Sequence, residues 1–374
     1  MKQLQKFVKL CLGSAMALSM TACSSGSSSA AASTTQTETV DAQKEYGCNA
    51  INVYNAGEYI DTAVLSAFEK QYNARVNYDT FDSNETMYTK LLGGSSYDVI
   101  VPSDYMIERM ISEDMLQPLN QDQQTNEADY DPAVLKMRDA YDKDGKYSVP
   151  YFWGSVGLVY DKTVVSEDDI KNEGWNILKD TKYKGNIYYY DSQRDGFMVA
   201  FKALGYSMNT ENEDEIQAAY KWLREMNDTM EPAYVTDEVI DGMVNGNKGI
   251  AIMYSGDAAY VLSQNENMAW VEPEQGTNIW SDSMVIPKNA SCAGLANEFI
   301  NYMASYDAQL ANTTAVGYTS VRSDVEKEMT AKDGDYYEND AYTVREDGKN
   351  DEVFHYNEKL TKALSDLWNK VKVQ

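Results

Sequence analysis

Short apolar strands alternate with amphipathic helices along most of this chain, and that alternation limits the choice of fold most strongly. The sequence predicts strands at residues 50–54, 75–81 and 97–101. Apolar residues at helical spacing through residues 60–72, and again before Gly93, predict helices between these strands. Strands that alternate with helices are typical of a parallel sheet covered by helices on both faces. We therefore expect an α/β fold.

The same alternation returns in the second half of the chain. Strands are predicted at residues 186–190, 249–254 and 279–286, each followed by a helix, and residues 360–371 form a terminal amphipathic helix. Open α/β sheets bind ligands at the carboxyl ends of their strands. The loops expected there are Asn55–Tyr59, Ser103–Tyr105, Asp191–Asp195 and Tyr254–Asp257.

The first residues have the pattern of a secretory signal. Lysines precede an apolar run from Phe7 to Met20, and small residues lead to Cys23 and a serine-rich stretch. This arrangement predicts a lipoprotein signal peptide at 1–22, lipid attachment at Cys23 and a flexible tether at 23–45. We expect an extracytoplasmic protein anchored to a bacterial membrane; the alternative is an ordinary secreted protein with a chance cysteine.

Length and charge restrict the classes of function. The chain has 374 residues and a net charge of −27, and removing the three lysines of the signal leaves −30. The length suggests two lobes. An acidic surface disfavours nucleic acid and attracts cations. The chain has a single histidine, His355, and this scarcity argues against zinc hydrolysis and histidine acid–base chemistry. His355 is predicted to lie at the surface.

Two further cysteines, Cys48 and Cys292, remain after the signal and the lipidated residue are set aside. A disulfide between them and a pair of free thiols are both compatible with the sequence. The chain carries no glycine-rich phosphate loop, no Cys-x-x-Cys pair and no evident metal-ligand cluster. Ser255 does not lie in a G-x-S-x-G turn. We therefore expect no cofactor and no metal.

Carboxylates and aromatic residues are interleaved in the candidate loops, and the chain has 29 tyrosines and 6 tryptophans against 8 phenylalanines. An alkyl ammonium ion is bound by a carboxylate that accepts its hydrogen bonds and by aromatic faces that cover its methylenes. The loops are therefore suited to an organic cation. Each of these residues also has a plain structural interpretation, as an exposed acid or a core aromatic.

Several motifs occur in a particular order: Tyr54-Asn55-x-x-Glu58-Tyr59, Asp82-Ser83-Asn84-Glu85-Thr86-Met87-Tyr88, Tyr97-Asp98-Val99-Ile100-Val101-Pro102-Ser103-x-Tyr105, Tyr147-Ser148-Val149-Pro150-Tyr151-Phe152-Trp153-Gly154, Leu204-Gly205-Tyr206-Ser207, Trp280-Ser281-Asp282-Ser283-Met284 and Gly317-Tyr318-Thr319. With these motifs, residues 46–372 resemble the spermidine/putrescine-binding proteins of bacterial polyamine ABC transporters.

The resemblance implies a two-lobe periplasmic-binding-protein fold of type II, with the ligand in a cleft between the lobes. Lobe one would comprise 46–154 plus 281–327, and lobe two 155–280 plus 328–374. The residues implied to bind ligand are Glu58, Tyr59, Ser103, Tyr105, Ser192, Asp195, Tyr254, Trp280, Asp282 and Tyr318. Asp195 and Asp282 would pair with separate amines, and the aromatic residues would wall the alkyl chain.

The chain departs from the family pattern at the cleft. Ala56 stands where a tryptophan is usual, and Tyr254 replaces a second tryptophan. Ser192 stands at the first acid of an Asp-x-x-Glu pair, with Asp191 one residue away, and Phe354 aligns loosely with a glutamine. These changes leave the preferred ligand length open.

The resemblance implies a monomeric receptor that binds a polyamine, spermidine or putrescine or both, and delivers it to an ABC permease. It implies no enzymatic activity and no nucleic-acid partner. A receptor of the same fold for another cation, such as a basic amino acid, is the first alternative, with Arg194 as the cleft residue that would bind its carboxylate. An extracellular hydrolase or a surface adhesin is less favoured.

Overall fold

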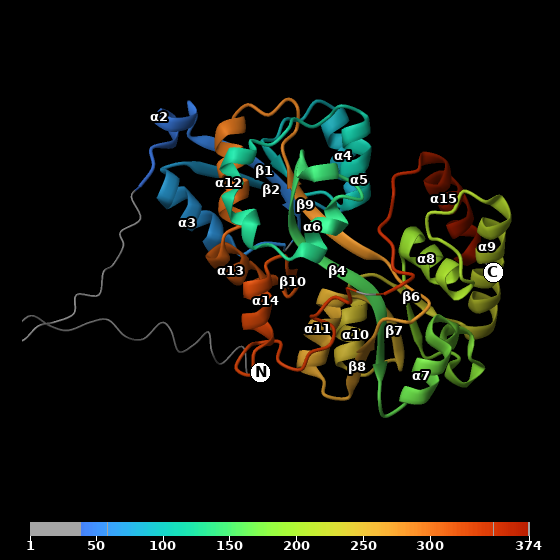
Figure 1. The fold of residues 1–374 in the computed structure, drawn as a ribbon. Coiled ribbons are helices and arrows are strands. Elements are labelled where there is room, and N and C mark those ends of the chain that lie inside the picture. The colour runs from blue at the N-terminus through green and yellow to red at the C-terminus, as the bar shows by residue number, and fades with distance from the viewer. Residues whose placement is uncertain (1–38, 58, 347, 373–374) are drawn as a thin grey trace, which may run out of the picture. The chain divides into compact units, whose positions relative to one another are not determined.

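The computed structural model describes residues 39–57, 59–346 and 348–372, beginning with the short helix α2 (Ala42–Tyr46) (Figure 1). The backbone N–H of Lys44 donates to the Asp41 carboxylate at 3.2 Å, and Ala42 is fully buried. The last residues of the predicted tether, 42–45, are therefore helical, because Asp41 caps the helix and Ala42 packs into the core. The predicted signal and Cys23 lie outside the described residues.

The strands of the described residues form one mixed sheet in which two parallel sets flank an antiparallel centre. The first set is β2-β1-β3 and the second is β7-β5-β6, and every neighbouring pair within each set is parallel, as the sequence predicted. Their bounds are β1 (Ala50–Ala56), β2 (Arg75–Phe81), β3 (Val99–Ile100), β5 (Ile187–Tyr190), β6 (Ala233–Val235) and β7 (Ile250–Tyr254).

The antiparallel centre corrects the expectation of a purely parallel sheet. Strand β4 (Ser148–Asp161) pairs through residues 148–155 with β9 (Ile279–Val285), and through residues 156–161 with β7 and β8 (Met268–Val271). The short β10 (Thr319–Ser320) also pairs with β4. The fully buried β4 was not predicted, because Pro150 and two glycines interrupt its apolar pattern; the register shifts next to Pro150.

Two groups of helices cover the two strand sets (Figure 1). The first lobe, as named here, consists of the first strand set with α3 (Thr62–Tyr72), α4 (Asn84–Leu92), α5 (Asp104–Ser112), α6 (Pro132–Arg138), α12 (Ala293–Met303) and α13 (Tyr306–Val316). The second lobe consists of the second strand set with α7 (Glu167–Glu173), α8 (Gln193–Ala203), α9 (Glu213–Met230), α10 (Glu238–Val244), α11 (Ser255–Gln264) and α15 (Glu358–Lys372).

Each lobe has its own apolar cores. Phe68, Val99 and Phe299 belong to the first-lobe core, whereas Trp175 and Phe197 belong to that of the second lobe. Helix α14 (Ser323–Thr330) spans the predicted lobe boundary at residue 327, and its buried side chains pack with the second lobe. The exact lobe boundaries stay a prediction.

Helix α4 begins at Asn84, directly after its capping residue. Ser83 is the N-cap, and its side chain accepts a hydrogen bond from the Thr86 backbone N–H at 3.1 Å. Glu85, in the first turn of this helix, accepts a hydrogen bond from the Tyr105 hydroxyl. This leaves the Glu85 carboxylate facing the second lobe.

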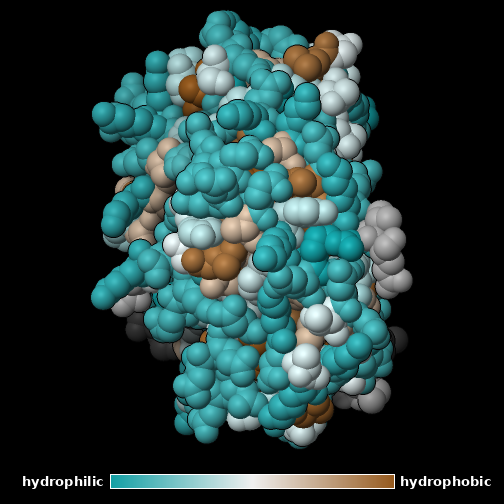
Figure 2. Space-filling view, turned by 90° about the vertical axis from the view of Figure 1, so that its right-hand side faces the viewer, coloured by the Kyte–Doolittle hydropathy of each residue, from teal (hydrophilic) through white to brown (hydrophobic). Residues whose placement is uncertain are grey.

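The surface of the second lobe over α9 and α15 is largely hydrophilic, with small separate apolar patches (Figure 2). His355 is also at the surface, with its side chain 44 % exposed, as expected. Among the described residues, the helices are too short or too polar to cross a bilayer.

A disulfide joins Cys48 to Cys292 within the first lobe, which settles a pairing that the sequence left open. The two Cα atoms are 6.2 Å apart, and the residues are separated by 244 positions in the chain. Cys48 precedes β1 and Cys292 is the N-cap of α12, so the bond ties the chain before β1 to the start of this helix.

We expect reduction of this disulfide to lower the free energy of unfolding by about 2–5 kcal/mol, because the cross-link restricts the unfolded chain. Urea denaturation with and without reductant measures the effect, and a Cys48→Ser/Cys292→Ser variant is the control that should not respond to reductant. Identical midpoints for the oxidised and reduced protein would contradict the prediction.

Candidate ligand-binding site

The loops selected from the sequence follow the carboxyl ends of parallel strands in both lobes. In the first lobe, Asn55–Tyr59 begins in the last two residues of β1 and Ser103–Tyr105 follows β3. In the second lobe, Asp191–Asp195 follows β5 and Tyr254–Asp257 begins at the last residue of β7. Trp280 and Asp282 lie on β9 itself. Glu58 lies outside the described residues, so its predicted role stays a prediction.

Asp282 is held by groups from the first lobe. The Tyr59 hydroxyl donates to its carboxylate at 2.8 Å, and Ser103 pairs with Asp282 in an isolated antiparallel bridge. Asn84 fixes Ser103 in turn, by accepting from the Ser103 backbone N–H at 3.0 Å and donating to its hydroxyl at 2.9 Å. Burial raises the pKa of Asp282, while the hydroxyls of Ser103 and Tyr59 oppose that rise.

Asp195 is held in the second lobe at the start of α8. The Tyr254 hydroxyl donates to its carboxylate at 2.8 Å, and its side chain lies within the first helical turn, where the helix dipole stabilises a negative charge. Ser192 is the N-cap of this helix and accepts from the Asp195 backbone N–H at 3.4 Å. Ser192 therefore caps the helix that carries Asp195.

A continuous set of aromatic rings connects the two acids. Tyr254 contacts Trp280 edge-to-face at 6.1 Å between centroids, Trp280 contacts Tyr318 at 5.3 Å, and Tyr318 contacts Tyr59 at 5.6 Å. Two glycines make room for these rings. A Cβ on Gly154 would lie 2.6 Å from the Trp280 ring, and one on Gly256 would lie 2.3 Å from Tyr318. Larger residues at either position would displace the rings.

Asp257 is a third carboxylate of this cluster that we did not select as a site residue, although it lies in a predicted site loop. The Tyr318 hydroxyl donates to it at 3.2 Å. Burial, the largest cause, raises the Asp257 pKa to about 6, Tyr318 opposes the rise and the Asp237 charge adds to it. The signal that could have identified it is its place at the first turn of α11, directly after a strand end.

Tyr105 contacts Arg194 and Glu85 and lies beside the cluster of acids and aromatic rings. Its ring lies 3.2 Å from the guanidinium carbon of Arg194, and its hydroxyl donates to Glu85 at 3.1 Å. The neighbouring Asp104 is buried; burial raises its pKa to about 7, and Arg194 is among the groups that oppose the rise. Tyr105 thus lies beside the cluster and is covered by an arginine of the second lobe.

The structure shows the contacts of two residues at which the chain departs from the family pattern. Asp191 accepts hydrogen bonds from Trp368 at 3.0 Å and from Lys372 at 2.5 Å, so it is engaged by α15 rather than by the cluster. Phe354 is buried and lies 5.0 Å from the Arg194 guanidinium. Within the residues described, no group of three or more acidic, histidine or cysteine side chains is arranged to hold a metal ion.

Two lobes joined by long central strands, with acids and aromatic rings from both lobes gathered where the lobes meet, define a solute-binding protein. A family model for bacterial extracellular solute-binding proteins matches residues 63–341. The chain belongs to this family, and the predicted α/β two-lobe fold is thereby confirmed.

Similar proteins carry polyamine names. The chain is 31 % identical over 272 residues to the spermidine/putrescine-binding periplasmic protein of Escherichia coli, covering 72 % of this chain and 77 % of that one. It is 26 % identical to spermidine/putrescine-binding periplasmic protein 1 of Haemophilus influenzae over 87 % and 88 % of the two chains. The structure of the spermidine/putrescine ABC transporter substrate-binding protein PotD from Streptococcus pneumoniae superposes with a TM-score of 0.73 at 34 % identity, covering 87 % and 98 %.

Proposed function

We propose that this protein is an extracytoplasmic receptor that binds a polyamine, spermidine or putrescine or both, and delivers it to the permease of an ABC transporter. The observation that carries this proposal is the pair of carboxylates at opposite ends of one connected set of aromatic rings: Asp282 on the first-lobe side and Asp195 in the second lobe. The relatives named above support the same ligand class.

The arrangement suits a slender dication energetically. A charged hydrogen bond contributes about 1.5–3 kcal/mol, and a cation over an aromatic face gains about 0.5–2 kcal/mol. Two amines bound in this way, with methylenes covered by Trp280 and Tyr318, are compatible with the roughly 8 kcal/mol that micromolar binding requires. Asp257 supplies a third acid for a further amine. The other predicted contacts, Glu58, Ser192 and Tyr105, remain part of the proposal.

A basic amino acid is a poorer fit, because its carboxylate needs an unengaged cation. Arg194, the residue considered for that role, already stacks on Tyr105 and lies 3.6 Å from a Glu85 oxygen. A hydrolase is also less favoured, since the family and the relatives are transport binding proteins. We propose a binding protein without enzymatic activity, with lobe closure around the ligand as its working step.

The remaining parts of the proposal concern location and assembly. We propose that Cys23 carries the lipid that anchors the protein outside the cytoplasmic membrane, and that the receptor acts as a monomer without a nucleic-acid partner. The family name, which describes extracellular proteins, supports the location. The strongly acidic composition supports both a cationic ligand and the absence of nucleic acid.

We expect spermidine and putrescine to raise the melting temperature of the purified protein, because a ligand that binds only the folded state stabilises it by mass action. A thermal-shift panel should also contain arginine, lysine and ornithine at equal concentrations as controls for charge. Stabilisation by an amino acid but by neither polyamine would replace the proposed ligand, and chemical conversion of recovered spermidine would support an enzyme instead.

A further inference from the structure

Arg194 connects the two lobes beside the proposed binding site. It belongs to α8 of the second lobe, whereas the groups that its guanidinium contacts, Tyr105 and Glu85, belong to α5 and α4 of the first. The guanidinium carbon is 3.2 Å from the Tyr105 ring centroid, and Nη2 is 3.6 Å from Glu85 Oε1. The Arg194 side chain is only 21 % exposed.

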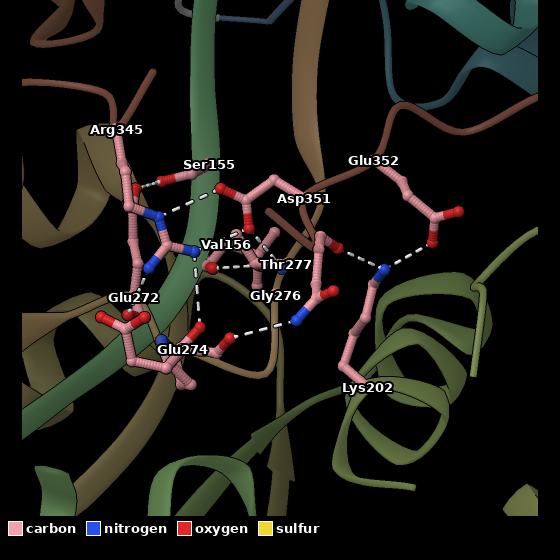
Figure 3. A network of polar contacts seen from close by, with 12 residues as sticks. Ser155, Val156, Lys202, Glu272, Glu274, Gly276, Thr277, Arg345, Asp351 and Glu352 are labelled. Carbon is pink, nitrogen blue, oxygen red and sulfur yellow. Dashed lines mark hydrogen bonds and ion pairs between the residues drawn. The ribbon is translucent and has the colours of Figure 1, made fainter. Parts of the chain in front are cut away.

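The same guanidinium also contacts Phe354, whose backbone is held against the second lobe. Figure 3 shows the polar network that anchors the segment before Phe354. Lys202 of α8 donates to the Asn350 carbonyl at 2.6 Å and forms an ion pair with Glu352. Arg345 closes the other end of this segment, with its Nη2 2.6 Å from Asp351 Oδ1.

These contacts of Arg194 differ in whether they cross between the lobes. The segment before Phe354 is tied to the same helix as Arg194 through Lys202, whereas the Tyr356 backbone N–H, two residues after Phe354, donates to Glu108 of α5 in the first lobe at 2.6 Å. Tyr105 and Glu85 move with the first lobe, so those contacts exist only while the lobes are together. The arginine therefore contributes free energy to the closed form and not to an open one.

We infer that Arg194 is a clasp residue: by stacking on Tyr105 and pairing with Glu85 it stabilises the closed receptor and slows ligand release. The inference rests on the proposed function for its ligand, and it deepens that function by adding a positioning residue. A cation over an aromatic face from which water is largely excluded is worth enough to change an equilibrium about tenfold. Affinity differences within one binding site are mostly differences in dissociation rate.

Stopped-flow tryptophan fluorescence with spermidine tests this inference on Arg194→Ala, Arg194→Lys and Glu85→Gln. We expect Arg194→Ala to raise the dissociation rate constant about tenfold while the association rate constant changes less than about twofold. Arg194→Lys should recover part of the loss, because it keeps the charge near Glu85 but lacks the planar group that stacks on Tyr105. Arg75→Ala, at an exposed arginine of β2, is the matched control.

An unchanged dissociation rate in Arg194→Ala would overturn the inference while leaving the polyamine assignment intact. So would a drop in the melting temperature of the ligand-free protein together with equal changes in both rate constants, which would indicate a purely structural role. If wild-type protein binds no polyamine, the proposed function fails. The same comparison of dissociation rates, made with whichever ligand of the thermal-shift panel does bind, then decides the inference alone: faster release from Arg194→Ala supports it, and an unchanged rate overturns it.

Discussion

Replacing Asp282 by asparagine is expected to weaken polyamine binding by at least about tenfold, and replacing Asp195 by asparagine should do the same. Each change keeps the shape of the side chain but removes the charge that an ammonium group would meet, a loss of about 1.5–3 kcal/mol. Isothermal titration calorimetry with spermidine and putrescine measures the effect. Asp168→Asn, at an exposed acid of α7 in the second lobe, is the matched control for a change in net charge.

Single and double variants together test whether one ligand spans both acids. If two amines of a single polyamine are bound, the Asp195→Asn/Asp282→Asn variant should lose binding beyond the range of calorimetry. Tyr59→Phe and Tyr254→Phe remove only the hydroxyls that donate to Asp282 and Asp195, so they should give smaller losses. Affinities unchanged in both single Asn variants would remove these acids from the site.

Lowering the pH from 8 to 5 is expected to weaken polyamine binding with a midpoint near pH 6, and Asp257 is the residue that we expect to be responsible. Burial raises the pKa of this carboxyl from 3.8 to about 6, so it becomes neutral as the pH falls through that value. The amines of the ligand stay charged throughout. Calorimetry across this pH range should show the decline in wild type and a flatter profile in Asp257→Asn.

The ligand-free protein should respond to pH in the opposite direction. A carboxyl whose pKa is raised on folding contributes stability that is complete below its unfolded pKa and is lost as pH rises through the folded pKa. Asp257→Asn should therefore increase the free energy of unfolding of the ligand-free protein at pH 8, by an amount on the order of 2 kcal/mol. A higher melting temperature of the variant at this pH is the measurable sign. The pKa of Asp104 is raised to about 7, so this residue changes the stability with pH in the same direction. Because Asp104 is present in both wild type and Asp257→Asn, its contribution cancels in the comparison.

Two results would contradict this assignment. If Asp257→Asn retained the full pH dependence of binding, another group would be responsible, and Asp282, whose pKa burial also raises, would be the next to test. If binding were independent of pH between 8 and 5, Asp257 would not face the ligand. Burial is the largest cause of the raised Asp257 pKa and the Tyr318 hydroxyl opposes it, so Tyr318→Phe should raise this pKa further.

The strand ends and helix faces were largely readable from the sequence. Strand β2 occupies Arg75–Phe81 as predicted, and β7 differs from its prediction by one residue. Local periodicity predicts these elements because the buried face of each strand or helix is formed by apolar residues at regular spacing within a short segment. The family motifs added the predicted ligand-binding residues, including the Asp195 and Asp282 pair.

Contacts between distant residues were beyond the sequence. Tyr59 and Asp282 are 223 positions apart, and the sheet formed by the described residues has antiparallel β4 and β9 at its centre, where periodicity predicted only parallel pairing. The choice between Asp191 and Ser192 also depended on α15, whose Trp368 and Lys372 hold Asp191. Such pairings depend on which surfaces meet after folding.

The sequence by itself determined the alternation of strands and helices, the loops at the strand ends and the membership of a binding-protein family, because these are encoded in local patterns and ordered motifs. Tertiary structure alone decided that Cys48 pairs with Cys292, that Asp257 joins the acids of the cluster and that Arg194 lies against the opposite lobe. The physical reason is that hydrogen bonds, stacking and burial act over a few ångströms of space, whatever the distance along the chain.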